Sequence, residues 1–131
     1  MSAPSTIRSL ADLALRLRAF AAERDWDRFH EPRNLAMALA AETAELAAHF
    51  RFAPEAAGWQ PDAAARAEIE QEMADVLIYL VRLADKLEAD LPSAVLRRLA
   101  SARGGWAAGR VNRPAACADS PAGRWSAASV P

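Results

Sequence analysis

The sequence has few of the residues that disulfides, thiolate metal sites and membrane spans require. Its single cysteine, Cys117, excludes an intrachain disulfide and a zinc site built from several cysteines. It contains no run of about 18 apolar residues, which excludes a membrane-spanning helix. The N-terminal residues also lack the apolar core of a secretory signal, so we expect a cytoplasmic protein.

Acidic and basic side chains nearly balance over the chain as a whole. The 131 residues include 16 basic and 17 acidic side chains, which excludes a polybasic nucleic-acid binder and a polyacidic tail. The distribution is uneven, however. Residues 1–96 carry a net charge of −6 and residues 97–131 a net charge of +5, so the acidic excess of the first part requires an explanation.

Alanine makes up about a quarter of the chain, and it favours helices and fills a strand face poorly. Apolar residues recur at three- and four-residue steps over residues 6–24, 32–50 and 62–88, and again from about residue 90. We therefore predict an all-α, four-helix bundle-like domain over residues 1–104. The periodicity then stops, and the Ala-, Gly-, Pro- and Ser-rich residues 105–131 are predicted to form a flexible tail.

The predicted helices have local boundary signals. Ser5 or Thr6 can cap the first helix, Pro32 suits the first turn of the second, and Asp62 can cap the third. The run VLIYLV at residues 76–81 is apolar almost all round, which predicts a third helix buried on several sides. Because a domain of about 100 residues has a modest core, we expect association with further copies.

Two acidic pairs are the candidate chemical groups. Glu42 and Glu45 lie three residues apart on the second predicted helix, and Glu72 and Asp75 lie three apart on the third, so each pair shares a helix face. Both pairs adjoin apolar positions, where like charges are costly unless a cation compensates them. Oxygen ligands without cysteine favour Mg²⁺, with Mn²⁺ as a possible substitute.

The same residues have other interpretations. A single acidic pair on an Ala-rich helix is most often a solvated face. A ferritin-like di-iron site is disfavoured, because it uses Glu-x-x-His motifs and the fourth positions here are Glu45 and Asp75. His49, one turn after Glu45, could be a ligand, but it fits better as a surface histidine at a helix end.

Longer strings of sequence narrow these alternatives. ERDWDRFHEPRNLAMALAAETAEL, followed by EMADVLIYLVRLADKLEADLP, resembles the MazG-like superfamily of all-α nucleoside triphosphate pyrophosphohydrolases, and within it the dCTP pyrophosphatase branch. The resemblance covers about residues 16–99. It implies Mg²⁺-dependent hydrolysis of a nucleoside triphosphate, dCTP or a modified dCTP above all, to the monophosphate and pyrophosphate. It also implies nucleotide-pool control by a homo-oligomer, a dimer or tetramer. The lack of a long apolar run and the balance of charge predict no membrane and no nucleic-acid partner.

The resemblance assigns roles to the acidic pairs. Glu42, Glu45, Glu72 and Asp75 become the expected metal ligands. Glu42 and Glu45 become the expected catalytic carboxylates, with Glu45 taking the proton of the attacking water. A tetra-acidic site can bind a triphosphate only through cations that bridge the two, which agrees with this assignment.

The resemblance also implies a set of substrate-binding residues. Trp26 is expected to stack on the base, although it could instead close the linker onto the helices. Phe52 replaces a second tryptophan of the family, which leaves the base preference open. Each remaining residue could either contact the substrate or have a structural role, such as capping a helix or packing in the core. These residues are His30, Arg33, Asn34, Tyr79 and Arg98.

The chain departs from the family pattern after the fourth predicted helix. Ala100, Ala102 and the Gly-Trp-Ala at residues 105–107 replace polar and aromatic residues expected to help grip the substrate. The alternative function is therefore a catalytically weak or inactive helical interaction module with the same fold. The hypothesis of a nucleic-acid binder built on the six C-terminal arginines has less support, because these arginines are sparse and the rest of the chain is acidic.

Overall fold

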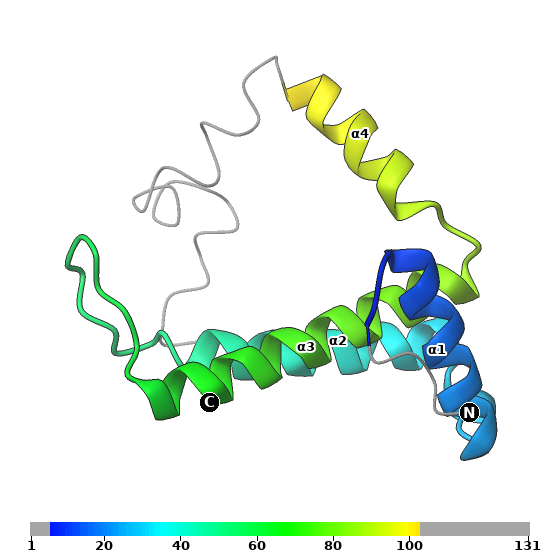
Figure 1. Cartoon of the computed structure of the whole chain (residues 1–131), viewed down its shortest axis with the longest axis horizontal. Helices are drawn as coiled ribbons and strands as arrows, with labels where there is room; N and C mark the ends of the chain where they lie inside the picture. The colour runs from blue at the N-terminus through cyan, green and yellow to red at the C-terminus, as the bar shows by residue number, and fades with distance from the viewer. Residues whose placement is uncertain (1–5, 103–131) are drawn as a thin grey trace. The chain divides into compact units, whose positions relative to one another are not determined.

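The structure is a computed structural model that describes residues 6–102, which contain four α-helices, one short 3₁₀ helix and no strand (Figure 1). The elements are α1 (Leu10–Glu23), η1 (Asp27–Phe29), α2 (Pro32–Ala48), α3 (Ala63–Lys86) and α4 (Leu91–Ala102). The predicted all-α class is therefore confirmed. None of the described helices is long and apolar enough to cross a membrane. The predicted tail, residues 105–131, lies outside the described residues.

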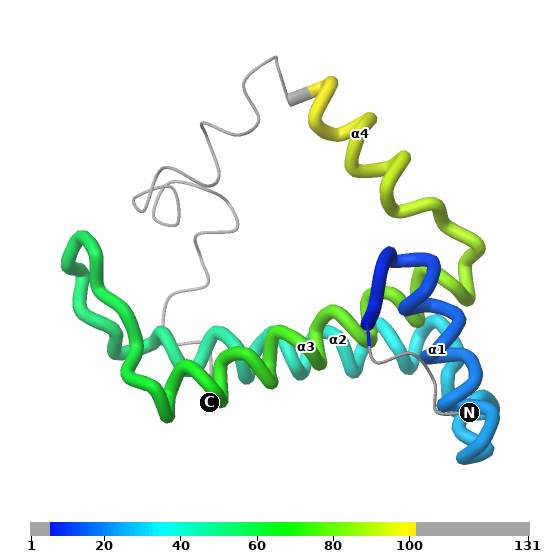
Figure 2. The backbone as a smooth tube through the Cα atoms, in the orientation of Figure 1, coloured from blue at the N-terminus to red at the C-terminus, as the bar shows by residue number. Residues whose placement is uncertain are grey.

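The chain divides into two units, with the boundary between Ala89 and Asp90. The first unit holds α1, η1, α2 and α3, and the tube in Figure 2 shows α2 and α3 running along each other as a helical hairpin. In the second unit Asp90 caps α4, because its carboxylate accepts a hydrogen bond from the backbone N–H of Ser93 at 3.0 Å. The single domain expected over residues 1–104 stays a prediction.

The starts of the helices follow local capping chemistry. Pro32 occupies the first turn of α2, and the carboxylate of Asp62 accepts from the N–H of Ala65 at 2.9 Å, as predicted. The predicted cap of α1 is wrong, since α1 begins later and its cap is Ser9. The Ser9 hydroxyl accepts from the N–H of Asp12 at 3.0 Å, and the Asp12 carboxylate accepts from the N–H of Arg8 at 3.0 Å.

The end of α1 sets the position of Trp26. Asp25 adopts the left-handed conformation (φ 54°), and its N–H donates to the carbonyl of Ala22 at 3.2 Å. The N–H of Trp26 donates to the carbonyl of Ala21 at 2.9 Å. These two bonds form a Schellman motif, which ends the helix and turns the chain sharply into η1.

The core lies where α1 and α2 pack on α3. Its most buried apolar side chains come from all three helices, and they are Leu13, Ala21, Leu35, Ile69, Val81 and Ala84. The expectation that α3 is buried on several sides holds only in part, because α1 and α2 cover it but leave one face exposed. Met73, Leu77 and Leu80 stay 48%, 42% and 37% exposed, and their spacing puts them on one face of α3. The first unit therefore presents an exposed apolar stripe along α3.

We predict that truncating Leu35, which is 1% exposed, destabilises the fold strongly. Leu35→Ala should lower the free energy of unfolding by about 2–5 kcal/mol, because it removes buried methyl groups and leaves a cavity. Leu35→Met keeps the volume and should cost less than about 1.5 kcal/mol. Denaturant unfolding followed by circular dichroism measures both values. Equal losses for the two variants would contradict the core position of Leu35.

Candidate active site

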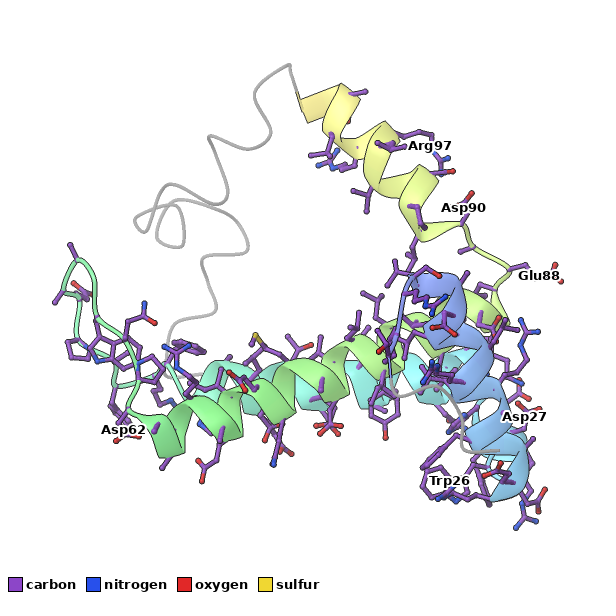
Figure 3. The ribbon with its side chains drawn as sticks, viewed as in Figure 1. Trp26, Asp27, Asp62, Glu88, Asp90 and Arg97 are labelled. Atoms are coloured by element: carbon purple, nitrogen blue, oxygen red, sulfur yellow. The ribbon has the colours of Figure 1, made fainter. Side chains whose placement is uncertain are left out.

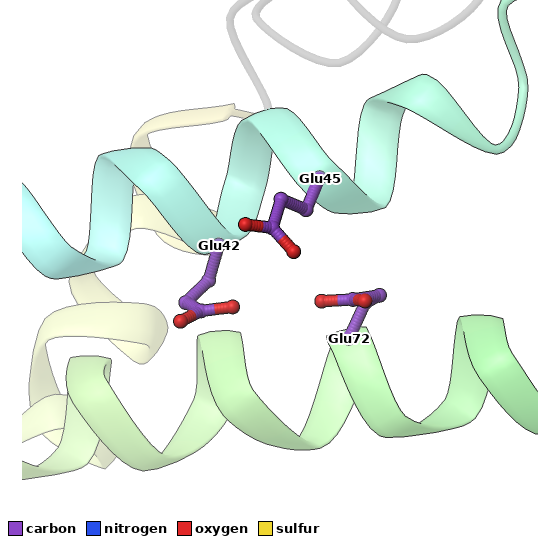
Figure 4. Close-up of side chains that lie close together, drawn as sticks. All are labelled: Glu42, Glu45 and Glu72. Carbon is purple, nitrogen blue, oxygen red and sulfur yellow. The ribbon is translucent and has the colours of Figure 1, made fainter.

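Helices α2 and α3 bring three of the predicted metal ligands together. Glu42 and Glu45 point from α2 toward α3, and Glu72 faces them from α3 (Figure 4). One carboxylate oxygen of each residue lies within 4.8 Å of the others. We refer to Glu42, Glu45 and Glu72 as the acidic cluster. Its donors are oxygens only, which are the ligands that Mg²⁺ and other hard cations prefer.

The acidic cluster is electrostatically costly without a cation. Burial, reinforced by the charges of Asp75, Glu45 and Glu72, raises the pKa of Glu42. Within residues 6–102, no lysine or arginine forms an ion pair with a carboxylate of the cluster. The chemistry of these residues therefore fits a divalent cation, which would supply the positive charge that the surrounding side chains do not.

His49 lies closer to the acidic cluster than the sequence suggested. It is the C-cap residue of α2, it is half-buried, and its Nε2 lies 3.9 Å from Oε1 of Glu72. That separation is too long for a hydrogen bond. His49 is therefore a neighbour of the cluster and not an exposed surface histidine.

Asp75, the fourth predicted ligand, lies one turn along α3 from Glu72 and borders a cavity of about 420 Å³. We call this space the Trp26 cavity. Its walls come from α1, from the turn around η1 and from α3. The lining includes three of the predicted substrate-binding residues and two further residues of α3, namely Trp26, His30, Tyr79, Ile78 and Arg82. The acidic cluster and the cavity are thus joined through Asp75.

Aromatic rings cover one wall of the Trp26 cavity. The rings of Phe20 and Trp26 meet edge to face, with centroids 5.6 Å apart, and the His30 ring lies 6.5 Å from Trp26. Trp26 stays 45% exposed, so its ring is available to a flat ligand. This wall offers the stacking surface that a nucleotide base needs, next to carboxylates suited to metal-bound phosphate.

The other predicted substrate residues lie outside this cavity. Asn34 donates from its side chain to the carbonyl of Phe29 at 3.2 Å, which ties η1 to the start of α2, and Arg33 beside it is exposed. Phe52 lies in the loop after α2 and is 90% exposed. Arg98 lies on α4, in the second unit. The proposed roles of these residues stay predictions.

One residue at this site was missed by the sequence analysis. Arg82 is 2% exposed, lines the Trp26 cavity, and bonds to Asp27, His30 and Asp85. The signal for it was a single positive charge within an otherwise apolar stretch of α3, directly after residues 76–81. A charged residue in such a stretch is either exposed or paired, and the pairing partners are distant in sequence.

Known proteins resemble this chain in both sequence and fold. No family model matches the chain. Over 84 residues it is 50% identical to dCTP pyrophosphatase 1 of Homo sapiens and 49% identical to that of Rattus norvegicus, and each match covers 61% of this chain and 48% of the relative. It is also similar to the solved structure of a pyrophosphatase from Archaeoglobus fulgidus, with 29% identity and a TM-score of 0.61, covering 80% of this chain and 98% of that one.

The chain is therefore similar in sequence to dCTP pyrophosphatase 1 and in fold to a known pyrophosphatase. The resemblance drawn from its motifs is therefore confirmed. The matched segment spans about half the length of the curated relatives. The two acidic pairs lie on the helices α2 and α3 that form the hairpin.

We predict that the acidic cluster lowers the stability of the protein when no divalent cation is present. Because the pKa of Glu42 is raised, the folded state binds this proton more tightly than the unfolded state. The contribution of Glu42 to folding is therefore most favourable at low pH, and it is lost as the pH rises through the raised pKa. Glu42→Gln should raise the Tm by a few degrees at pH 7 in metal-free buffer.

The matched control is Glu55→Gln, which removes an exposed carboxylate of the loop after α2. Its Tm should stay at the wild-type value. Thermal scans at pH 7 and at about pH 4 measure the effect, and the gain from Glu42→Gln should shrink at the lower pH. A Glu42→Gln variant that is less stable than wild type at pH 7 without metal would contradict the electrostatic cost.

Proposed function

We propose that this chain is a nucleotide pyrophosphohydrolase that uses Mg²⁺, or Mn²⁺ in its place, to hydrolyse a nucleoside triphosphate to the monophosphate and pyrophosphate. Its substrate is dCTP or a modified dCTP, and its role is nucleotide-pool control. The carrying observation is that Asp75 joins the acidic cluster to the Trp26 cavity. The names of the curated relatives support the choice of dCTP. A cytoplasmic location and the absence of a nucleic-acid partner belong to the same proposal.

The proposal divides the substrate between the two parts of the site. Glu42, Glu45, Glu72 and Asp75 hold the divalent cations. When bound, these cations neutralise phosphate charge and polarise the phosphoryl group that is attacked. The base occupies the Trp26 cavity and stacks on the Trp26 ring, with Tyr79 on the α3 wall. The triphosphate then extends past Asp75 toward the cluster.

Glu45 is the proposed general base. It is exposed, whereas Glu42 and Glu72 are half-buried, so Glu45 has room to move between the cations and a water molecule. Its carboxylate would accept the proton of the water that attacks the α-phosphorus. Glu42 is less suited to this step, because it is half-buried and has less room to reach a water molecule.

We predict that the protein converts dCTP to dCMP and pyrophosphate when Mg²⁺ is present, and that EDTA stops the reaction. Glu45→Gln should lower kcat by about 10²-fold or more, because a positioned general base contributes roughly 10²–10⁴-fold. The helical circular dichroism of this variant should equal that of wild type. Chromatography of a panel of nucleoside triphosphates and their products measures both the base preference and the bond that breaks.

Glu55→Gln serves again as the control and should leave kcat unchanged. Release of inorganic phosphate and a diphosphate would contradict the proposed bond cleavage. If no nucleotide is turned over and divalent cations give no increase in Tm, the protein is instead the non-catalytic helical module.

A homo-oligomer is part of the proposal, because Phe52 and Trp26 cannot contact one base within a single chain. Trp26 precedes α2 and Phe52 follows it, and the 17 residues of α2 span about 25 Å. Figure 3 shows Trp26 at one end of the hairpin and Asp62, which belongs to the same loop as Phe52, at the other end. The exposed apolar stripe on α3 supplies a surface for a second copy, and Phe52 of that copy would complete the base site.

We predict that two impaired variants restore activity when they are combined. Phe52→Ala should lower kcat/KM by about tenfold through lost stacking, and Glu45→Gln should lower kcat. In a hybrid formed by co-expression with different tags, one site contains an intact Glu45 from one copy and an intact Phe52 from the other. The hybrid should therefore be more active than either variant alone. Sedimentation as a stable monomer, or a hybrid with only the average activity of its two variants, would contradict the shared site.

A further inference from the structure

Arg82 is unusual among the described residues because it is the one polar or charged side chain that is buried. It projects from α3 at the junction of α3, the C-terminal half of α1 and the turn that holds η1. A buried guanidinium is costly unless acceptors surround it. The acceptors of the Arg82 hydrogen bonds therefore show which side chains Arg82 holds in place.

Three nitrogens of Arg82 bond to three different side chains. Nη2 donates to Oδ1 of Asp27 at 2.9 Å, Nη1 donates to Oδ2 of Asp85 at 3.2 Å, and Nε donates to Nδ1 of His30 at 3.2 Å. Asp27 is the first residue of η1 and His30 is its C-cap, so Arg82 holds this short segment at both ends. Lys86 adds a second bond to Asp27, at 2.8 Å.

The bond to His30 determines which imidazole nitrogen carries the proton. A guanidinium is a donor at every nitrogen and accepts nothing, so Nδ1 of His30 has to be the acceptor and the ring proton lies on Nε2. Within residues 6–102, no protein group accepts a hydrogen bond from this Nε2–H. Since His30 lines the Trp26 cavity, the donor is left for a molecule that enters the cavity.

The charges around His30 favour the same state of the ring. Burial and the nearby charge of Arg82 lower the pKa of His30, while the charge of Asp27 acts in the opposite direction. A hydrogen bond from Lys86 lowers the pKa of Asp27, and a hydrogen bond from Arg18 lowers the pKa of Asp85. Both carboxylates are thus ionised partners of Arg82, and the imidazole is its neutral one.

We propose that Arg82 is a positioning residue for base recognition, because it fixes His30 as an Nε2–H donor and holds Trp26 and His30 together at the cavity wall. The ligand that this wall selects is a planar base with a hydrogen-bond acceptor on its edge, such as a carbonyl oxygen or an unprotonated ring nitrogen. This inference rests on the proposed function, since it assigns the nucleotide base to the Trp26 cavity.

A lysine could not perform this task. The fork of the guanidinium satisfies three acceptors in fixed directions, whereas an ammonium is a single point charge on a flexible stem. Arg82→Lys should therefore release His30 from one tautomer even though it keeps the charge. Arg82→Met removes every donor while keeping much of the apolar stem.

The first test needs no substitution. In the full-length wild-type protein with ¹⁵N-labelled histidine, two-bond ¹H–¹⁵N correlation spectra distinguish the two neutral tautomers. We expect His30 to carry its proton on Nε2 in the absence of nucleotide. A proton on Nδ1 would overturn the proposal, whatever the activity of the enzyme.

The second test compares Arg82→Met and Arg82→Lys with Arg18→Gln. Arg18 belongs to the same charge network through Asp85, but it is 59% exposed and does not contact His30, so it is a matched loss of one cation. We expect both Arg82 variants to lose the single tautomer and to raise KM for the preferred nucleotide by about tenfold, with a smaller change in kcat. Arg18→Gln should keep the wild-type tautomer and KM.

Discrimination between bases is the readout that a purely structural role would not change. The Arg82 variants should narrow the differences in kcat/KM between nucleotides, while the increase in Tm on adding Mn²⁺ stays as in wild type. An equal rise of KM for every nucleotide, or the same changes in Arg18→Gln, would overturn the positioning role. If wild type hydrolyses no nucleotide, the proposed function fails, and the tautomer measurement still decides the role of Arg82.

Discussion

The packing of α2 against α3 is the constraint on which the rest of the molecule depends. It buries apolar side chains such as Leu35, Ile69 and Val81, and the same contact forces the carboxylates of the acidic cluster to within a few ångströms of each other. Hydrophobic burial therefore stabilises an arrangement that electrostatics opposes. The helix packing therefore brings the cluster carboxylates close together before a cation binds, at a cost in stability.

The parts of the fold that were predictable are those specified by residues close together in the sequence. Pro32 and Asp62 mark helix starts because each acts within three residues of itself. The same local chemistry misled the prediction for α1, where several hydroxyl side chains compete. Ser9 is the cap because Asp12 follows it three residues later: the Asp12 N–H donates to the Ser9 hydroxyl, and the Asp12 carboxylate accepts from the N–H of Arg8.

The site was predictable to the extent that helical periodicity determines it. A three-residue spacing places Glu42 beside Glu45 and Glu72 beside Asp75 on any helix. Periodicity does not fix the rotation of one helix against another, which decides that Glu72 joins the acidic cluster while Asp75 borders the Trp26 cavity. The bonds from Arg82 to residues 52 and 55 positions away depend on the same tertiary packing, so no local pattern could reveal them.

The Schellman motif at the end of α1 has a consequence for how this chain can vary. Trp26 follows the left-handed Asp25 directly, so the direction of the indole is set by the residue at which α1 stops. Each residue of an α-helix turns the chain by about 100°. Adding or deleting one residue in α1 would leave a helix of nearly the same length, yet it would swing the ring around the helix axis and away from the cavity. The length of α1 therefore matters for function, because it sets where the Trp26 ring points.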